Sequence, residues 1–147
     1  MELEGSRILP IDREHAWRAL NDPALIQAAI PGCESMEKVG ENEYRITVAA
    51  SLGPVKTKLR GRLHVEDIDK PTSYTLRFEG EGAAAGFVKG SAAVKLSGNG
   101  AETTLDYTAH AQVGGRLAQI GDRLVRSSAL KLTDDFFAAF EKNVAGA

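Results

Sequence analysis

Two periods of apolar residues divide the chain into a strand-like part and a helical part. Between residues 33 and 113, apolar and polar residues alternate, for example through residues 44–52 and 55–65. Such alternation is typical of antiparallel strands with one buried and one wet face. Four turn-like segments separate the alternating runs: Gly40-Glu41-Asn42, Gly53-Pro54, Lys70-Pro71-Thr72 and Gly98-Asn99-Gly100. The pattern therefore predicts a meander of six strands.

The segment before the meander predicts one strand and two short helices. Residues 2–9 suit a strand. Asp12 can cap a first helix, and Asp22 followed by Pro23 marks the start of a second helix. The second helix is expected to stop at Pro31-Gly32, because neither residue continues a helix well.

A helical period begins after Gly114-Gly115 and continues to about residue 143, roughly 28 residues or about 42 Å. One stripe at three- and four-residue spacing contains Leu117, Ile120, Leu124, Ser128, Leu132, Phe136 and Phe140. A second stripe of Leu130, Phe137 and Val144 is either covered by another element or forms a docking surface. The whole pattern predicts an α+β fold in which a curved antiparallel sheet of about seven strands wraps around a long C-terminal α-helix.

The composition is that of one ordinary globular domain. The 147 residues are 43% apolar and 26% charged, and we assign residues 1–147 to a single domain. A net charge of −2 argues against a nucleic-acid partner, because such binders need cations to release phosphate counterions. Cys33 is the only cysteine, which excludes an internal disulfide and fits a reducing cytosol. The sequence shows no signal peptide and no membrane-spanning run, so we expect a cytoplasmic protein.

Small residues occupy many inward positions of the predicted sheet. They are Ala50, Gly61, Gly80, Gly82, Gly90, Ala92, Ala109 and Ala111. Protein interiors are densely packed, so small side chains imply either a close approach of the helix or an apolar ligand that fills the space. Glycine also permits the kinks that curved strands need, so bending of the sheet is a third explanation. The sequence alone leaves these interpretations open.

The larger inward side chains and the helix stripe supply a candidate ligand-binding set. Its members are Leu52, Leu59, Phe78, Phe87, Tyr107, Leu117, Ile120, Gly121, Leu124, Ser128 and Phe136. The glycine- and alanine-rich segment 80–87 has little to pack with and ends in an aromatic residue. We interpret it as a mobile lid formed by Gly82, Gly86 and Phe87, with a simple β-bulge as the alternative.

Residues for catalysis or metal binding are not grouped along the chain. His64 and His110 fall on the wet face of their strands, and His15 lies in the first turn of a helix. Cys33 has no partner at the spacing of a zinc site and follows a Pro-Gly helix stop, which favours a buried structural thiol. No serine elbow, phosphate loop or dinucleotide motif occurs. We therefore predict no catalytic residue, no metal site and no cofactor other than a bound quinone or lipid.

Six short segments resemble those of a known family. They are residues 21–23 (NDP), 30–33 (IPGC), 52–56 (LGPVK), 82–90 (GAAAGFVKG), 113–124 (VGGRLAQIGDRL) and 136–140 (FFAAF). The resemblance is to the CoxG family, the G-type subunits of carbon monoxide dehydrogenase, within the START-like helix-grip (SRPBCC) superfamily. It spans nearly the whole chain, and the run 113–124 is its most specific part.

The resemblance implies a role as well as a fold. Superfamily members hold lipophilic molecules between the sheet and the terminal helix, so the implied ligand is a hydrophobic small molecule such as a quinone or lipid. The implied partner is a carbon monoxide dehydrogenase-type molybdenum hydroxylase, and the implied location is peripheral to the inner face of the membrane.

Three functions fit such a fold. The first is a non-enzymatic carrier that binds a lipophilic ligand and docks onto a redox enzyme. The second is a cyclase- or hydrolase-like enzyme using the same cavity, and the third is a protein-docking module with a filled core. An enzyme of this kind needs ionisable groups that face inward, and the predicted inner face has almost none. We therefore favour the carrier.

Overall fold

A computed structural model describes residues 1–52, 54–83 and 85–145 of the chain. Within these residues the elements are β1 (Glu2–Leu9), α1 (Arg13–Leu20), α2 (Pro23–Ala29), β2 (Cys33–Gly40), β3 (Glu43–Leu52), β4 (Val55–Asp69), β5 (Ser73–Gly82), β6 (Gly86–Asn99), β7 (Glu102–Gly114), α3 (Arg116–Gln119) and α4 (Asp122–Ala145). Strand 1, two short helices, six strands and a long terminal helix follow one another as the sequence predicts.

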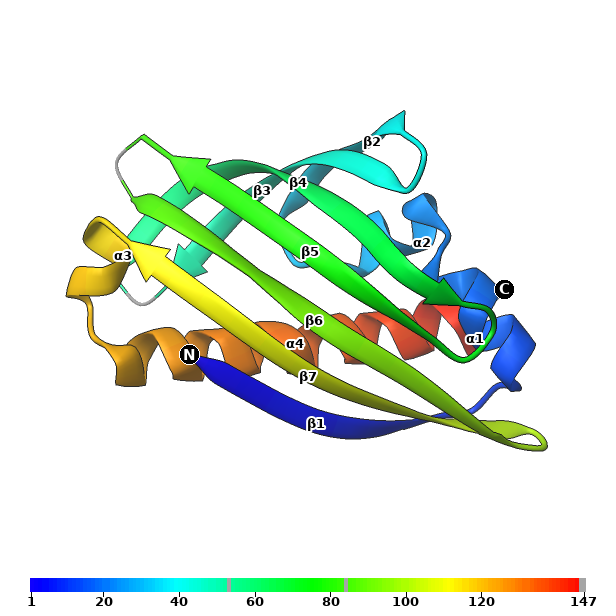
Figure 1. Cartoon of the computed structure of the whole chain (residues 1–147). Helices are drawn as coiled ribbons and strands as arrows, with labels where there is room; N and C mark the ends of the chain where they lie inside the picture. Colours follow the sequence, from blue (N-terminus) through cyan, green and yellow to red (C-terminus); the bar gives the residue numbers. More distant parts are fainter. Residues whose placement is uncertain (53, 84, 146–147) are drawn as a thin grey trace.

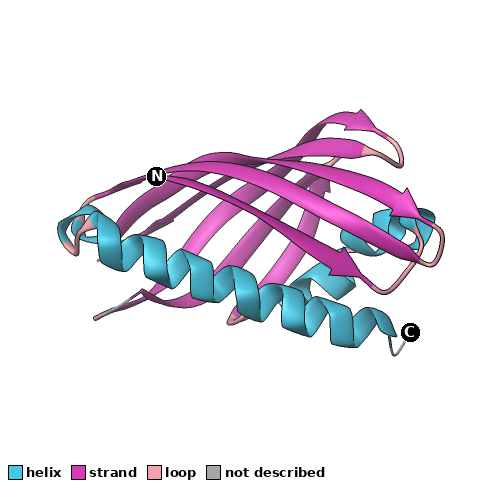
Figure 2. Ribbon diagram, turned by 90° about the horizontal axis from the view of Figure 1, so that it is seen from below, coloured by secondary structure: helices cyan, strands magenta, loops and turns pink. Residues whose placement is uncertain are grey.

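The strands form one antiparallel sheet in the order β1-β7-β6-β5-β4-β3-β2. β2 to β7 make the predicted meander, and β1 extends it by pairing with β7, where Leu3 lies opposite Ala109. The helices lie behind the sheet in Figure 1. Seen from below, the sheet arches over α4, which runs along its concave side (Figure 2). The helix-grip fold predicted from the two periods is thereby confirmed.

Local chemistry explains where the two short helices begin. The carboxylate of Asp12 accepts a hydrogen bond from the backbone N–H of His15 at 3.4 Å. The carboxylate of Asp22 accepts one from the N–H of Ala24 at 3.0 Å, with Pro23 at the start of α2. Both aspartates satisfy backbone donors that have no partner within the helix, as the sequence predicts.

The terminal helix is interrupted near its start, which the sequence analysis did not predict. Gly121 adopts a φ of +95°, in the left-handed region, and separates the four-residue α3 from the 24-residue α4. Gly115, before α3, also has a positive φ of +68°. Glycine adopts this conformation at little cost because it has no Cβ. α4 alone still extends about 36 Å, more than six turns.

Two inward glycines permit close approach of neighbouring strands. A Cβ on Gly61 would lie 1.8 Å from the carbonyl oxygen of Glu79, and one on Gly90 would lie 2.0 Å from that of His110. Gly80, directly opposite Gly61, is different, because its Cβ would find only ordinary contacts at 3.8 Å. At Gly61 and Gly90, the interpretation based on sheet geometry is therefore the correct one.

The main core lies at the end of the molecule that carries α1, α2 and the C-terminal half of α4, which we call the α1 end. Buried members include Trp17, Leu96 and Phe140. The rings of Trp17 and Tyr74 meet edge to face at 5.4 Å. The main core joins the two short helices, one end of the sheet and the last turns of α4.

The second helix stripe is largely covered. Phe137 is buried, stacked on Tyr107 at 6.0 Å, and the Arg7 guanidinium lies 5.1 Å from its ring centre. Val144 is also buried, whereas Leu130 is 39% exposed. Of the two interpretations of this stripe, internal coverage therefore holds for Phe137 and Val144.

None of the helices in the described part of the chain combines the length and the apolar character needed to cross a membrane.

Candidate functional site

The middle of the sheet's inner face is the part of the interior that α4 leaves incompletely covered. Four side chains here, which we call the central inner face, are Leu59, Leu63, Phe78 and Val88, and all four are half-buried. Strand register places Leu63 beside Phe78 and Phe78 beside Gly90. On α4, Ser128 and Leu132 are also half-buried. Solvent therefore still reaches apolar side chains of the sheet and the helix midway along the grip.

Two packed clusters lie on either side of this central inner face. The main core closes the α1 end. At the opposite end, which we call the α3 end, a small cluster of Val55, Ala85 and Leu117 is buried, with Val113 and Ile120 packed against it. The backbone N–H of Leu117 donates to the carbonyl of Ala85 at 2.9 Å, which ties α3 to the β5–β6 turn. The α3 end is thus closed by far fewer side chains than the α1 end.

The structure divides the predicted ligand-binding residues into three groups. Leu59, Phe78, Tyr107, Ser128 and Phe136 are half-buried, with Tyr107 and Phe136 packed against the main core. Leu117 and Ile120 belong to the small cluster at the α3 end. The third group is Gly121, Leu124 and Phe87, which are exposed. The side chain of Leu52 lies outside the described residues.

Phe87 and Leu124 do not point into the grip. Phe87 is 42% exposed on the outer face, opposite Gly114, where a Cβ would lie 2.1 Å from the Phe87 ring. Leu124 is 37% exposed, while its neighbour Val125 is buried. The break at Gly121 explains this difference, because it rotates α4 relative to the stripe extrapolated from Leu117.

The predicted lid segment is a tight hairpin between β5 and β6. Gly82 pairs with Gly86, and the N–H of Ala85 donates to the carbonyl of Gly82 at 3.1 Å. Ala84, between them, lies outside the described residues. Ala85 is fully buried beneath α3, so opening the lid would require the bond between Leu117 and Ala85 to break. Lid motion remains a prediction.

Leu63, Val88 and Leu132 belong to the middle of the grip but were not in the predicted set. Leu63 and Val88 alternate with charged residues in the same way as Leu59, so the period-two signal already placed them inward. Leu132 lies in the predicted helix stripe. The signal was present, but the sequence did not show which part of the inner face the main core would fill.

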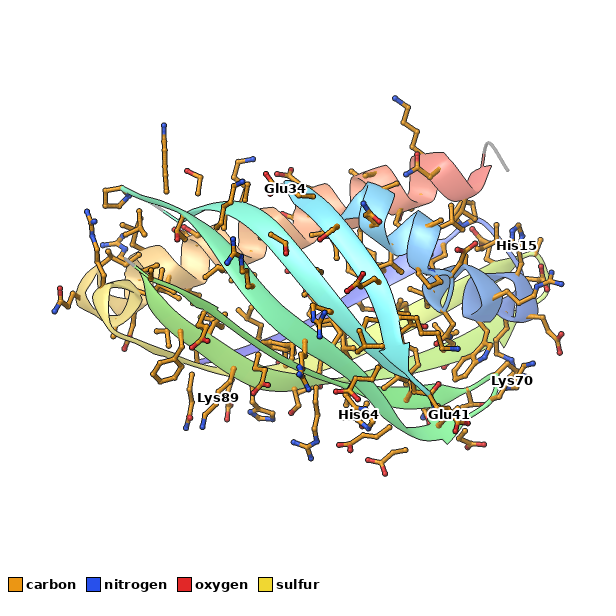
Figure 3. All side chains as sticks on the ribbon, turned by 90° about the horizontal axis from the view of Figure 1, so that it is seen from above. His15, Glu34, Glu41, His64, Lys70 and Lys89 are labelled. Atoms are coloured by element: carbon orange, nitrogen blue, oxygen red, sulfur yellow. The ribbon has the colours of Figure 1, made fainter. Side chains whose placement is uncertain are left out.

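Concavities of about 370 and 720 Å³ lie on the outer face of the sheet. The larger one is lined by outward residues such as Arg62, His64, Lys89 and His110. Figure 3 shows His64 and Lys89 pointing away from α4. Ion pairs cross this face, including Arg62 with Glu43 at 3.4 Å and His110 with Glu2 at 3.2 Å. These features are typical of a solvated, charged sheet surface.

Charged groups are scarce at inward positions. In the described residues of β3, β5, β6 and β7, the positions that alternate toward α4 hold no Asp, Glu or His. Arg7 on β1 faces α4, where it forms an ion pair with Asp134. Burial raises the pKa of the Tyr74 hydroxyl well above its ordinary value, so this group stays protonated at neutral pH.

The polar residues considered for metal chemistry are dispersed. Among the described residues, no three His, Cys, Asp or Glu side chains come together in a way that could hold a metal ion. Cys33 is half-buried and contacts the carbonyl of Ser35 at 3.4 Å. Burial raises the pKa of its thiol, and the hydrogen bond to Ser35 opposes that effect. A raised pKa disfavours the reactive thiolate, in keeping with the structural thiol predicted from the sequence.

A family profile decides the relationship suggested by the motifs. The profile of the carbon monoxide dehydrogenase G-type subunits (CoxG) matches residues 5–145. The chain belongs to the CoxG family. Together with the helix-grip fold, this membership supports a ligand-binding accessory role in general. A search of curated proteins found no match.

Solved structures confirm the fold. A conserved protein from Geobacillus kaustophilus is 35% identical with a TM-score of 0.94, over 99% of this chain and 96% of that one. A START superfamily protein from Mycobacterium smegmatis is 12% identical with a TM-score of 0.75, over 99% and 97% of the two chains. An aromatase/cyclase from Streptomyces sp. R1128 is 13% identical with a TM-score of 0.68, over 99% and 93%. The last two similarities concern the fold alone.

Proposed function

We propose that this CoxG-family chain is a non-enzymatic carrier that holds one lipophilic molecule, a quinone or another lipid, between its sheet and α4. The observation that carries the proposal is the half-buried central inner face, with Leu59, Leu63, Phe78 and Val88 on the strands. Apolar side chains that remain accessible inside a fold gain free energy when an apolar ligand removes them from water. The packed clusters at both ends leave the middle of the grip as the place for that ligand.

The chemistry of the inner face supports a carrier over an enzyme. Acid–base catalysis needs a titratable group within reach of the ligand, with a pKa suited to proton transfer. The inward tyrosine at position 74 stays protonated, and Arg7 is already paired with Asp134. These groups can orient a ligand, but they provide no general base.

A redox partner would give such a carrier its purpose. The family is described as a subunit of carbon monoxide dehydrogenase. We propose that the chain serves a molybdenum hydroxylase of that type and exchanges its ligand with the inner face of the membrane. A quinone would suit this role because it is both apolar and able to accept electrons.

Native mass spectrometry tests the binding function directly. The purified protein is expected to carry one lipophilic molecule per chain, which organic extraction removes and identifies. The extracted protein should then take up decylubiquinone or an anilinonaphthalene fluorescent probe. A protein that is ligand-free as purified, and that binds neither compound, would contradict the proposal.

Filling the grip from α4 should block uptake without unfolding the protein. Ser128→Phe places a ring at a half-buried position midway along α4, and we expect probe affinity to fall at least about tenfold, which corresponds to roughly 1.4 kcal/mol. Ser127→Phe is the matched control, because Ser127 is exposed on the same helix. Equal affinities of the two variants, measured by fluorescence titration, would show that the ligand does not lie against this part of α4.

A further inference from the structure

Charge is distributed unevenly between the two ends of the grip. The α3 end is formed by the β3–β4 and β5–β6 turns, α3 and the start of α4 (Figure 1). Five exposed cations lie there, and none forms an ion pair with another described residue: Lys56, Arg60, Lys89, Arg116 and Arg123. Among the described residues of these segments, the acidic groups that oppose them are Glu79, Glu81 and Asp122.

The opposite end has the reverse balance. Its three turns carry Glu41, Asp67, Asp69 and Glu102 against a single cation, Lys70. Glu41 and Lys70 lie together at this end in Figure 3. A protein with a net charge of only −2 is therefore dipolar along the grip. The dipole orients the α3 end toward any negatively charged surface.

Apolar side chains are exposed among the cations of the α3 end. Phe87 is 42% exposed beside Lys89, and Leu124 is 37% exposed beside Arg123. Both belong to elements that end here, because Phe87 follows the β5–β6 turn and Leu124 lies in the first turn of α4. An aromatic and an aliphatic residue flanked by cations fit the boundary between lipid headgroups and acyl chains.

We infer that the α3 end is a docking surface for an anionic lipid bilayer. The inference rests on the proposed function, because a carrier of apolar molecules must collect them where they dissolve. The cations contact lipid phosphates, while Phe87 and Leu124 insert among the headgroups. Only Val55, Ala85 and Leu117 are buried in the cluster that the described residues form between this surface and the central inner face, which gives the ligand a short, thinly closed route into the grip.

A bilayer fits this end better than an acidic protein does. An acidic protein surface would pair with the cations but would give Phe87 and Leu124 no apolar layer to enter. A bilayer accommodates both features, since each cation near an anionic membrane strengthens partitioning roughly fivefold. An acidic macromolecule is therefore the competing occupant that the experiments must separate from a bilayer.

The first experiment measures binding to vesicles by sedimentation. The protein should bind phosphatidylcholine vesicles that contain about one third phosphatidylglycerol, but not pure phosphatidylcholine vesicles. The double variant Lys89→Gln/Arg123→Gln should weaken this binding by roughly 25-fold, because it removes two of the cations. The double variant Lys95→Gln/Lys142→Gln removes the same charge elsewhere and should bind as the unmodified protein does. Equal losses in both variants, or no binding to either vesicle, would overturn the inference.

The second experiment asks whether the α3 end enters the bilayer. The fluorescence of Phe87→Trp should shift to the blue on addition of the anionic vesicles, since indole then leaves water. Ile68→Trp is the matched control, because Ile68 is 45% exposed near the opposite end of the sheet and should show no shift. Charge-dependent binding without a shift at position 87 would overturn docking to a bilayer and point to an acidic macromolecule.

Ligand binding without vesicles separates this inference from the proposed function. The Lys89→Gln/Arg123→Gln variant changes no residue of the central inner face, so its affinity for the anilinonaphthalene probe in solution should be unchanged. A protein that docks on vesicles but binds no probe would contradict the carrier function alone. A protein that binds the probe but ignores anionic vesicles would contradict the docking surface alone.

Discussion

Replacing Gly61 by alanine should destabilise the fold by about 1–3 kcal/mol, because the added methyl group overpacks a site where two strands meet. Its Cβ would lie 1.8 Å from the carbonyl oxygen of Glu79 and 2.7 Å from the Cα of Gly80. Both atoms belong to the backbone of β5, so β4 and β5 must separate to make room. Urea denaturation followed by circular dichroism measures the loss in the free energy of unfolding.

Gly80→Ala is the control for that measurement. Gly80 lies directly opposite Gly61, and its new Cβ would meet its nearest neighbours, on Arg60, Leu59 and Val88, at 3.8 Å. We expect a change within about 0.5 kcal/mol, since the methyl group fits without displacing the backbone. Two variants of equal stability would show that the strands can adjust at Gly61 and that this glycine is not required by their approach.

The sequence predicted the architecture because its local signals agree with one another. The alternation of apolar and polar residues reproduced the meander, and the capping aspartates Asp12 and Asp22 marked the two short helices. The pairing of β1 with β7 was not predicted, because nothing in a short alternating segment specifies which distant strand it joins. Long-range pairing depends on the shape of the whole sheet.

The role of each small inward residue could not be predicted from the sequence. Gly61 and Gly80 look alike in an alternating pattern, yet only Gly61 of the two lies where a neighbouring backbone excludes a side chain. The difference arises from the distance between strands, which depends on how the sheet bends over α4. Composition therefore predicts that a sheet is curved before it can predict where.

The candidate site was predicted in part, and its errors have a common origin. Leu59, Phe78 and Ser128 lie midway along the grip as half-buried residues, whereas Phe87 and Leu124 are exposed. Phe87 follows a tight hairpin that returns it to the outer face, and Leu124 follows the left-handed turn at Gly121. In both cases a glycine changes the direction of the chain, and a period extended across it assigns the next residue to the wrong face.

Phe140→Ala should be the most damaging single change at the α1 end, with an expected loss of about 3–5 kcal/mol, because truncation leaves a cavity that rigid neighbours fill poorly. Phe140 is 1% exposed and stacks on Phe136 at a ring distance of 5.8 Å. The control is Leu130→Ala on the same helix, where the side chain is 39% exposed and the loss should stay below about 1 kcal/mol. Thermal and urea denaturation of both variants measure the difference. Similar small losses would mean that the last turns of α4 contribute little to the fold, and that the grip is held chiefly by the sheet and the two short helices.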